Sequence, residues 1–367
     1  MEQASTGTEV SPEGVLPKGV WVMLQTGDER RELVKQELYD IVQATYEPIG
    51  GHVKITSPDS LDRYRYWMVE DLDEDPEIDV ALFGKPDIAG NKLGGAANVI
   101  MNLKSLGLNP ILCSVVGDDE SGRNIIRLIE DNKLESDGIV VEPRRKTTVK
   151  KRVIVKKNHV LRIDDEITEP INRNTRNLLI NKIISFTNES DILIFQDYDK
   201  GLINKKLIDQ VRSINNNIFI AADPKFKNFN DYKDVDLFKP NLNEISYSLN
   251  IKKYSDKNLM NIGKGFINKN KIKNLMITLS ERGIIIISDN EISQHKTSIN
   301  KIIDVSGAGD TVLALSSILF YLKLPQKFIG EMCNLAGGMA CMESGVVAIN
   351  CKELIKHAER NNIDLYL

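Results

Sequence analysis

The sequence is poor in the residues that build metal clusters and disulfide frameworks. Its 367 residues include only 4 cysteines and 4 histidines. The cysteines lie far apart and form no Cys-x-x-Cys pair; they are Cys113, Cys333, Cys341 and Cys351. A zinc site or a disulfide framework is therefore not expected. Reduced thiols suit the cytoplasm, which is the compartment we predict.

Long hydrophobic runs are also missing. No stretch reaches the roughly 20 consecutive apolar residues of a membrane span, and the first 18 residues contain three glutamates and do not resemble a signal peptide. The net charge is −4 at pH 7, with 41% hydrophobic and 27% charged residues. This composition is typical of a soluble globular protein, so neither a membrane nor a nucleic acid is an expected partner.

Asparagine is absent from residues 1–90, whereas residues 91–367 contain 32. We interpret this change as two segments of different origin, an atypical N-terminal segment over 1–90 and a larger domain over 91–367. The alternative is one continuous domain with uneven residue usage.

The larger segment alternates short apolar runs with helical patterns. The runs are rich in β-branched residues and read as buried strands; they span Ile111–Val116, Ile192–Phe195, Ile218–Ala222, Leu275–Thr278 and Ile284–Ile287. Helical patterns between them include Thr175–Ile184 and Lys205–Arg212. This alternation predicts an α/β fold with a mainly parallel central sheet flanked by helices. Alternating valines in Thr147–Asp165 predict a small β-ribbon outside that sheet.

The strongest motif is Asp304-Val305-Ser306-Gly307-Ala308-Gly309-Asp310-Thr311, followed by an apolar helical run. Free amides at the start of such a helix bind anions, and a carboxylate beside them suits a base that takes a proton from a hydroxyl. The alternative is a plain glycine-rich helix start, with Asp310 favourable to the helix dipole. The Walker pattern Gly-x-x-x-x-Gly-Lys-Ser/Thr is absent, which excludes a P-loop nucleotide site.

The motif resembles the late signature Asp-x-x-Gly-Ala-Gly-Asp of the ribokinase-like, or PfkB-type, carbohydrate kinases. The resemblance implies a ribokinase-like fold with a small β lid, ATP and Mg²⁺ as cofactors, and a sugar as acceptor. It makes Asp310 the catalytic base, with the amides of Gly307, Ala308 and Gly309 stabilising charge on the transferred phosphoryl group. Because members of the family often pair through their lids, it also implies a homodimer.

Three further elements resemble parts of this family. Gly94-Gly95-Ala96-Ala97-Asn98 is similar to its early glycine pair, which implies sugar contacts by Gly94, Gly95 and Asn98. Asn241-Leu242-Asn243-Glu244 resembles its Asn-x-x-Glu element, which places Asn241 near the nucleotide and Glu244 at Mg²⁺; the alternative is a helix capping box. Thr278-Leu279-Ser280-Glu281-Arg282-Gly283 resembles its Thr-x-x-x-x-Gly turn, which implies nucleotide contacts by Thr278, Ser280 and Gly283.

Other segments resemble a narrower group, the kinases of D-glycero-D-manno-heptose 7-phosphate. Among them are Asp197-Tyr198-Asp199-Lys200-Gly201, Asp223-Pro224-Lys225 and Leu161-Arg162-Ile163-Asp164. The resemblance implies sugar phosphate contacts by Asp197 and Lys200, with Lys225 and Arg162 as further positive charges, and a 1,7-bisphosphate as product.

The N-terminal segment departs from the family. Leu61-Asp62-Arg63-Tyr64 resembles the Leu-Asp-Arg-Tyr of its sugar-gripping aspartate, which makes Asp62 a candidate sugar ligand, but the preceding residues are polar and broken by Pro58. We therefore expect the first strand to be missing or replaced. Residues 1–90 are loosely similar to tailed-phage proteins instead. Two alternatives to heptose phosphorylation follow: a kinase for another sugar or nucleoside, and a phage-associated fusion protein without activity.

Overall fold

The computed structural model describes residues 92–155, 158–187, 190–214, 218–297, 302–343 and 345–363, together with strands β1 (Gly19–Leu24) and β2 (Arg65–Glu70). The chain divides into two units, one of residues 1–91 and 150–164 and the other of residues 92–149 and 165–367. In the first unit, β1 pairs with β2 in antiparallel orientation. Asp62, the candidate sugar ligand, lies outside the described residues.

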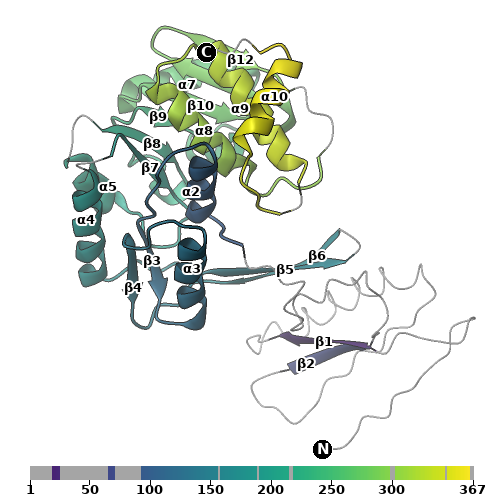
Figure 1. Cartoon of the computed structure of the whole chain (residues 1–367). Coiled ribbons are helices and arrows are strands. Elements are labelled where there is room, and N and C mark those ends of the chain that lie inside the picture. The colour runs from purple at the N-terminus through teal and green to yellow at the C-terminus, as the bar shows by residue number, and fades with distance from the viewer. Residues whose placement is uncertain are drawn as a thin grey trace, which may run out of the picture. The chain divides into compact units, whose positions relative to one another are not determined.

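The second unit is built on a six-stranded sheet with the order β12-β11-β10-β9-β8-β7 (Figure 1). The strands are β7 (Ile192–Gln196), β8 (Phe219–Asp223), β9 (Leu237–Phe238), β10 (Asn274–Thr278), β11 (Ile284–Ser288) and β12 (Ile292–His295). The strands from β7 to β10 are parallel neighbours, whereas β11 and β12 add an antiparallel edge. The expected mainly parallel sheet is therefore confirmed.

Two smaller sheets complete the strand inventory of the described residues. In one, β3 (Ser114–Gly117) pairs in parallel with β4 (Ile139–Glu142). In the other, β5 (Val149–Val155) pairs with β6 (Asn158–Asp165). The second pair is the ribbon predicted for Thr147–Asp165, and it is separate from the six-stranded sheet.

The described residues form nine α-helices, and polar side chains cap the first turn of several of them. They are α2 (Ala96–Ser105), α3 (Glu120–Asp131), α4 (Arg173–Thr187), α5 (Lys205–Arg212), α6 (Leu242–Ser248), α7 (Asp256–Asn270), α8 (Ala308–Tyr321), α9 (Gln326–Cys341) and α10 (Cys351–Arg360). Asn204, Ser255 and Asn350 each accept a hydrogen bond from a first-turn amide of the helix that follows. Such caps stabilise a helix start by about 1 kcal/mol.

The central sheet buries side chains on both faces because neighbouring residues of a strand point in opposite directions. In β11, Ile285 and Ile287 pack into the core beneath α4, α5, α6 and α7, whereas Ile284 and Ile286 pack into the core beneath α2, α8, α9 and α10. Both faces are thus covered by helices, which explains why the strands read as continuous apolar runs in the sequence.

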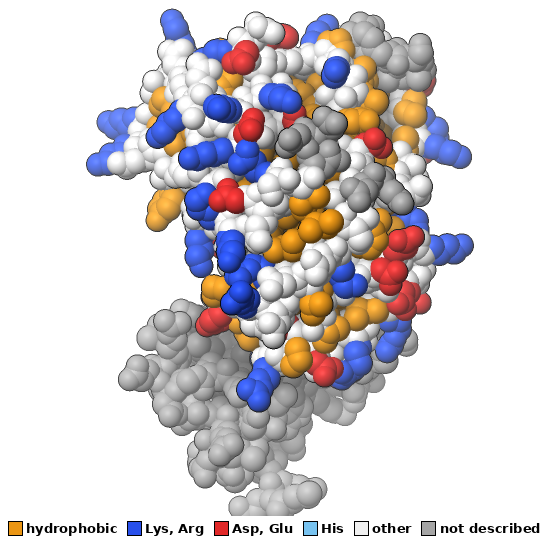
Figure 2. All heavy atoms as spheres, turned by 90° about the vertical axis from the view of Figure 1, so that its left-hand side faces the viewer, with side chains coloured by type: hydrophobic (Ala, Val, Ile, Leu, Met, Phe, Trp, Pro, Cys, Tyr) orange, Lys and Arg blue, Asp and Glu red, His pale blue; other side chains and the backbone are white. Residues whose placement is uncertain are grey.

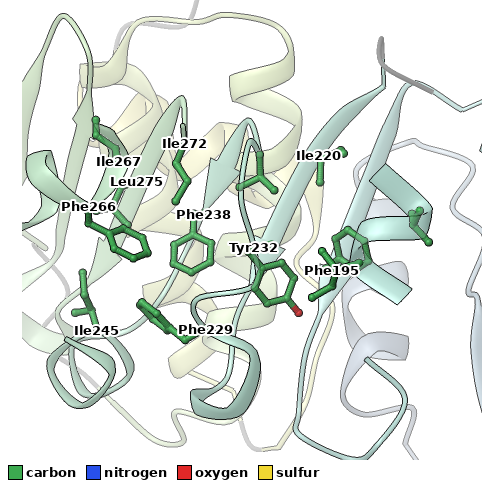
Figure 3. Packing of buried hydrophobic residues seen from close by; sticks show 14 of the residues in the cluster. Phe195, Ile220, Phe229, Tyr232, Phe238, Ile245, Phe266, Ile267, Ile272 and Leu275 are labelled. Atoms are coloured by element: carbon green, nitrogen blue, oxygen red, sulfur yellow. The ribbon is translucent and has the colours of Figure 1, made fainter. Parts of the chain in front are cut away.

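Aromatic rings fill the first of these two cores. Figure 3 shows the ring of Tyr232 between Phe238 and Phe195, with its hydroxyl directed away from the row of rings. Phe229 and Phe266 continue the contacts beyond Phe238. Because Tyr232 is fully buried, its hydroxyl needs an internal partner, and that partner is a carboxylate at the end of β7.

On the side that Figure 2 presents, the surface of the described residues has no large continuous hydrophobic patch. Hydrophobic side chains form separate small areas among charged and polar ones on this side, which carries α4 and α5. Leu178 and Ile184 of α4 are among the exposed apolar residues. No helix in the described ranges is long and apolar enough to cross a membrane.

Candidate active site

Asp310 lies in the first turn of α8, and both of its carboxylate oxygens accept a hydrogen bond. The side-chain amide of Asn98 donates to Oδ2 at 2.8 Å, and the hydroxyl of Tyr198 donates to Oδ1 at 2.7 Å. Asn98 belongs to the first turn of α2, which lies beside α8 (Figure 1), and Tyr198 belongs to the turn after β7. Three distant parts of the chain therefore meet at one carboxylate.

The start of α8 is shaped for close approach. Gly307 precedes the helix with a φ of 83°, and a Cβ atom added there would lie 2.8 Å from Nδ2 of Asn98. A side chain at this position would therefore be strained and would push Asn98 away from Asp310. The amide of Ala308 donates to the oxygen of Val305 at 3.4 Å, whereas the amides of Gly309 and Asp310 lie in the first turn, where no earlier turn supplies their usual carbonyl partners. This end of α8 can bind a phosphate group.

A second asparagine holds Asn98 in place. Asn102, one turn further along α2, donates from Nδ2 to the backbone oxygen of Asn98 at 2.9 Å. Its Oδ1 accepts from the hydroxyl of Thr311 at 3.2 Å and from the amide of Ile349 at 3.0 Å. Asn102 was not among the predicted site residues. Its spacing of four residues from Asn98 on one helix face was the available signal.

A buried ion pair lies close to Asp310. Asp223 ends β8, and its Oδ2 lies 2.9 Å from Nζ of Lys239, which follows β9; both side chains are buried. Nζ of Lys239 is also 3.9 Å from the position that a Cβ atom would take at Gly309. Neither residue of this pair was among the predicted site residues. Asp223 is the last residue of β8 and Lys239 directly follows the neighbouring parallel strand β9, so both lie at the strand ends where α/β proteins bind ligands.

The pKa of Asp310 is raised above the usual aspartate value of 3.8, chiefly because burial disfavours the charged carboxylate. The hydrogen bonds from Asn98 and Tyr198 oppose this rise. Of the two neighbouring charges, Asp223 raises the pKa further and Lys239 lowers it. A carboxylate with a raised pKa is a stronger base than an exposed one, provided that the working pH keeps it ionised.

Residues 241–244 form a helix capping box at the start of α6. Oδ1 of Asn241 accepts from the amide of Glu244 at 2.9 Å, and Oε2 of Glu244 accepts from the amide of Asn241 at 2.8 Å. The remaining oxygen of Glu244, Oε1, pairs with Nζ of Lys225. The capping box that the sequence analysis held as the alternative is therefore present.

Residues 85–320 match the pfkB family carbohydrate kinase. The chain belongs to this family. The match covers more than half of the chain. It includes Asp310 with its donors Asn98 and Tyr198, and the capping box of residues 241–244. The protein is accordingly a carbohydrate kinase, as the late signature predicted.

Curated relatives support the same assignment over most of the chain. The bifunctional protein HldE of Helicobacter acinonychis is 34% identical over 255 residues, which cover 69% of this chain and 54% of that protein. The bifunctional protein HldE of Helicobacter hepaticus is 30% identical over 313 residues, which cover 84% of this chain and 64% of that protein. The chain thus spans about half the length of the first of these relatives and under two thirds of the second.

Solved structures share the fold at low sequence identity. Phosphofructokinase-2 from Escherichia coli in complex with potassium has a TM-score of 0.63 at 17% identity, over 73% of this chain and 87% of that one. A putative ribokinase II from E. coli in complex with ATP and Mg²⁺ has a TM-score of 0.56 at 17% identity, over 73% and 89%. The predicted ribokinase-like fold is therefore confirmed.

The predicted nucleotide turn of this carbohydrate kinase lies beside the capping box. Thr278 ends β10, bridges to Asn241, and donates from its amide to the oxygen of Pro240 at 3.1 Å. Ser280 is exposed, and Gly283 has a φ of 87° with the oxygen of His295 2.0 Å from where a Cβ atom would be. The structure brings Thr278 and Asn241 together, whereas the contact of Gly283 is with the edge strand β12.

The two residues assigned to the sugar phosphate are engaged within the protein. Asp197 is 1% exposed and accepts hydrogen bonds from Asn228, Tyr232 and the amide of Asp199, at 2.9, 3.0 and 2.9 Å. Lys200 pairs with Glu166. The sugar contacts of Asp197 and Lys200 remain predictions, and the contacts of Asp197 favour an internal role. Gly94 is exposed, and Gly95 lies against the ring of Tyr198.

The donors around α8 fit a nucleotide phosphate better than they fit a dedicated metal site. The described residues hold no group of three or more His, Cys, Asp or Glu side chains placed to bind a metal ion. The carboxylate of Glu244 has the chemistry that Mg²⁺ prefers, but both of its oxygens already have protein partners. A metal ion at Glu244 would therefore share this carboxylate with Lys225 and with the amide of Asn241.

Proposed function

We propose that this carbohydrate kinase transfers the γ-phosphoryl group of ATP to a hydroxyl group of a phosphorylated sugar, with Asp310 as the general base. The observation that carries the proposal is the position of Asp310. Its carboxylate is oriented by two donors and lies in the first turn of α8, beside amides that have no partner within the helix. A base and an anion-binding helix start thus occupy the same turn.

The proposed step uses these groups as follows. Asp310 takes the proton from the acceptor hydroxyl, and the oxygen forms a bond to the γ-phosphorus as the bond to the β-phosphate oxygen breaks, which leaves ADP. The amides of Gly307, Ala308 and Gly309 stabilise the charge on the moving phosphoryl group. Lys239 adds a buried positive charge near Gly309. Glu244 would hold Mg²⁺, which when bound would neutralise further charge on the phosphates.

For the acceptor, we propose D-glycero-D-manno-heptose 7-phosphate, phosphorylated at its anomeric hydroxyl to the 1,7-bisphosphate. Two observations support this choice: the segments that resemble heptose 7-phosphate kinases, and relatives named HldE at 30–34% identity. In this proposal Gly94, Gly95 and Asn98 face the sugar. A homodimer remains a prediction that light scattering of the purified protein would test.

The experiment is ADP release by the full chain with Mg²⁺-ATP and a panel of acceptors. The panel should hold heptose 7-phosphate, fructose 6-phosphate, ribose, fructose and a nucleoside. We expect the highest kcat/KM with heptose 7-phosphate and a product phosphorylated at carbon 1. Preference for another acceptor would overturn the heptose assignment alone. If none of the acceptors in the panel led to ADP release, the result would favour the inactive fusion protein.

A further inference from the structure

Tyr198 connects the base to the two other parts of the site. Its hydroxyl donates to Oδ1 of Asp310 at 2.7 Å, and the edge of its ring lies 3.3 Å from the position of a Cβ atom at Gly95. Nζ of Lys225, which pairs with Glu244, lies 5.9 Å from the centre of the same ring. One side chain therefore lies against Asp310, Gly95 and Lys225.

The carboxylate of Asp197 holds the turn that carries Tyr198. Oδ1 of Asp197 accepts from the amide of Asp199 at 2.9 Å, while its Oδ2 is held by Asn228 and Tyr232 from the loop after β8. Asp199 adopts a φ of 55°, which is uncommon for a residue other than glycine. A turn held in such a conformation by a buried carboxylate has little freedom to swing Tyr198 away from Asp310.

A carboxylate oxygen has two lone-pair directions. Oδ1 of Asp310 can therefore accept from Tyr198 and from an acceptor hydroxyl at the same time. The tyrosine need not leave for the proposed reaction to occur, and its hydrogen bond fixes the direction of the second lone pair. This geometry favours an orienting role over a blocking one.

We infer that Tyr198 is a positioning residue, which orients the carboxylate of Asp310 toward the acceptor hydroxyl through the bond between its hydroxyl and Oδ1. The inference rests on the proposed function, in which Asp310 is the base. It gives Asp197 a place in the site as well: Asp197 anchors the turn that presents Tyr198, instead of contacting the sugar.

The electrostatics of the pair agree with this assignment. Burial and the nearby charge of Asp310 raise the pKa of Tyr198 far above its usual value, so the hydroxyl remains a donor across the working range. The bond to Tyr198 lowers the pKa of Asp310, against the rise caused by burial. Asp223 and Lys239 are the charged groups that also act on Asp310, and Tyr198→Phe leaves both in place.

The first test is kinetic and uses Tyr198→Phe in the full chain. Phenylalanine keeps the ring against Gly95 and removes only the donor. We expect kcat to fall about tenfold or more, the effect of losing one oriented hydrogen bond in a catalytic group, with the KM for ATP nearly unchanged. The acidic limb of the pH profile should move to higher pH, because the pKa of Asp310 rises when the donor is lost.

The control is Tyr321→Phe. Tyr321 also donates from its hydroxyl to an aspartate, Oδ1 of Asp191 at 3.1 Å, but on the exposed surface of α8. Its pH profile should match that of the wild type. An unshifted acidic limb in Tyr198→Phe, with kcat near the wild-type value, would overturn the inference.

A second test needs no substrate. Thermal unfolding of the wild type, Tyr198→Phe, Asp310→Asn and the double variant should be measured between pH 5 and pH 8. We expect the loss of Tm from Tyr198→Phe to grow with pH when Asp310 is present, because the lost donor then served an ionised carboxylate. In the Asp310→Asn background the loss should not vary with pH.

The two tests separate the inference from the proposed function. If the wild type phosphorylates no acceptor, the proposed function fails, and the unfolding cycle alone decides whether Tyr198 acts on the Asp310 carboxylate. If the wild type is active but the loss of Tm is the same at every pH in both backgrounds, the inference fails and the proposed function stands.

Discussion

Nδ2 of Asn98 lies 2.8 Å from Oδ2 of Asp310, although the two residues are 212 positions apart in the chain. The bond joins the first turn of α2 to the first turn of α8. It places the early glycine motif and the late Gly-Ala-Gly-Asp motif in one site. The two motifs lie far apart in the sequence, and this bond is a direct side-chain contact between them.

The hydrogen bond from Asn98 to Asp310 can be tested by replacing the donating amide of Asn98 with a carboxylate. In Asn98→Asp, two carboxylates would face each other and compete for one proton, which raises the pKa of Asp310. We expect turnover at neutral pH to fall about tenfold or more and to recover partly as the pH rises. Asn258→Asp, on an exposed first turn of α7, adds the same charge away from Asp310 and should leave turnover unchanged. A pH profile identical to that of the wild type would contradict the role of Asn98.

Asp310→Asn should separate activity from stability. The proposed loss of the base predicts turnover lower by roughly 10²-fold or more, measured as ADP release with the best acceptor, while ATP binding persists. The native pKa of Asp310 lies above the unfolded value near 3.8, so ionising the native carboxylate costs stability. That cost grows as the pH rises from about 4 through the native pKa.

Asparagine cannot ionise, so the variant should unfold at higher urea concentration than the wild type at neutral pH. The advantage should shrink as the pH falls and disappear below the unfolded value near 3.8, where the wild-type residue is protonated in both states. A variant that is less stable than the wild type at neutral pH would show that the carboxylate is stabilised in its charged form, contrary to the burial argument.

The sequence was informative where one local pattern determines the structure. The run Ile284–Ile287 predicted a strand buried on both faces, and Lys205–Arg212 predicted a helix that the structure has with the same bounds. The motif around Asp310 predicted a helix start, because two glycines followed by an apolar run leave few other conformations. These patterns needed no knowledge of distant partners.

The partners of Asp310 could not be derived in this way. Tyr198 and Asn98 approach it from two other elements, and neither spacing nor composition indicates which residues close that distance. The predicted sugar contact of Asp197 is another example, since the sequence did not reveal that Tyr232 and Asn228 would occupy its carboxylate. Sequence patterns therefore indicated residues of the candidate site but did not predict the contacts among them.

Gly307 offers a test of the helix start. Its φ of 83° and the short distance from a Cβ position to Nδ2 of Asn98 both oppose a side chain. Gly307→Ala should lower the free energy of unfolding by about 1–2 kcal/mol from the backbone conformation alone, and turnover should fall because Asn98 is displaced. The matched control is Gly265→Ala inside α7, where a Cβ atom meets nothing within 4 Å. That change should stabilise by about 0.5–1 kcal/mol; a destabilised Gly265→Ala or a neutral Gly307→Ala would contradict the argument.

Lys225 pairs with Glu244, and this pair can be tested directly. Burial alone would lower the pKa of Lys225, but the bond to Glu244 outweighs it and raises the pKa, so the lysine remains charged. Lys225→Met keeps the apolar stem and leaves the buried Oε1 of Glu244 without its donor, which should cost about 1–3 kcal/mol of stability in urea unfolding.

If Glu244 acts at Mg²⁺ as proposed, the freed oxygen should also lower the Mg²⁺ concentration that gives half-maximal turnover. Lys205→Met removes an exposed pair with Asp209 and should change neither quantity. An unchanged Mg²⁺ requirement in Lys225→Met, together with the expected loss of stability, would assign Glu244 to the capping box alone.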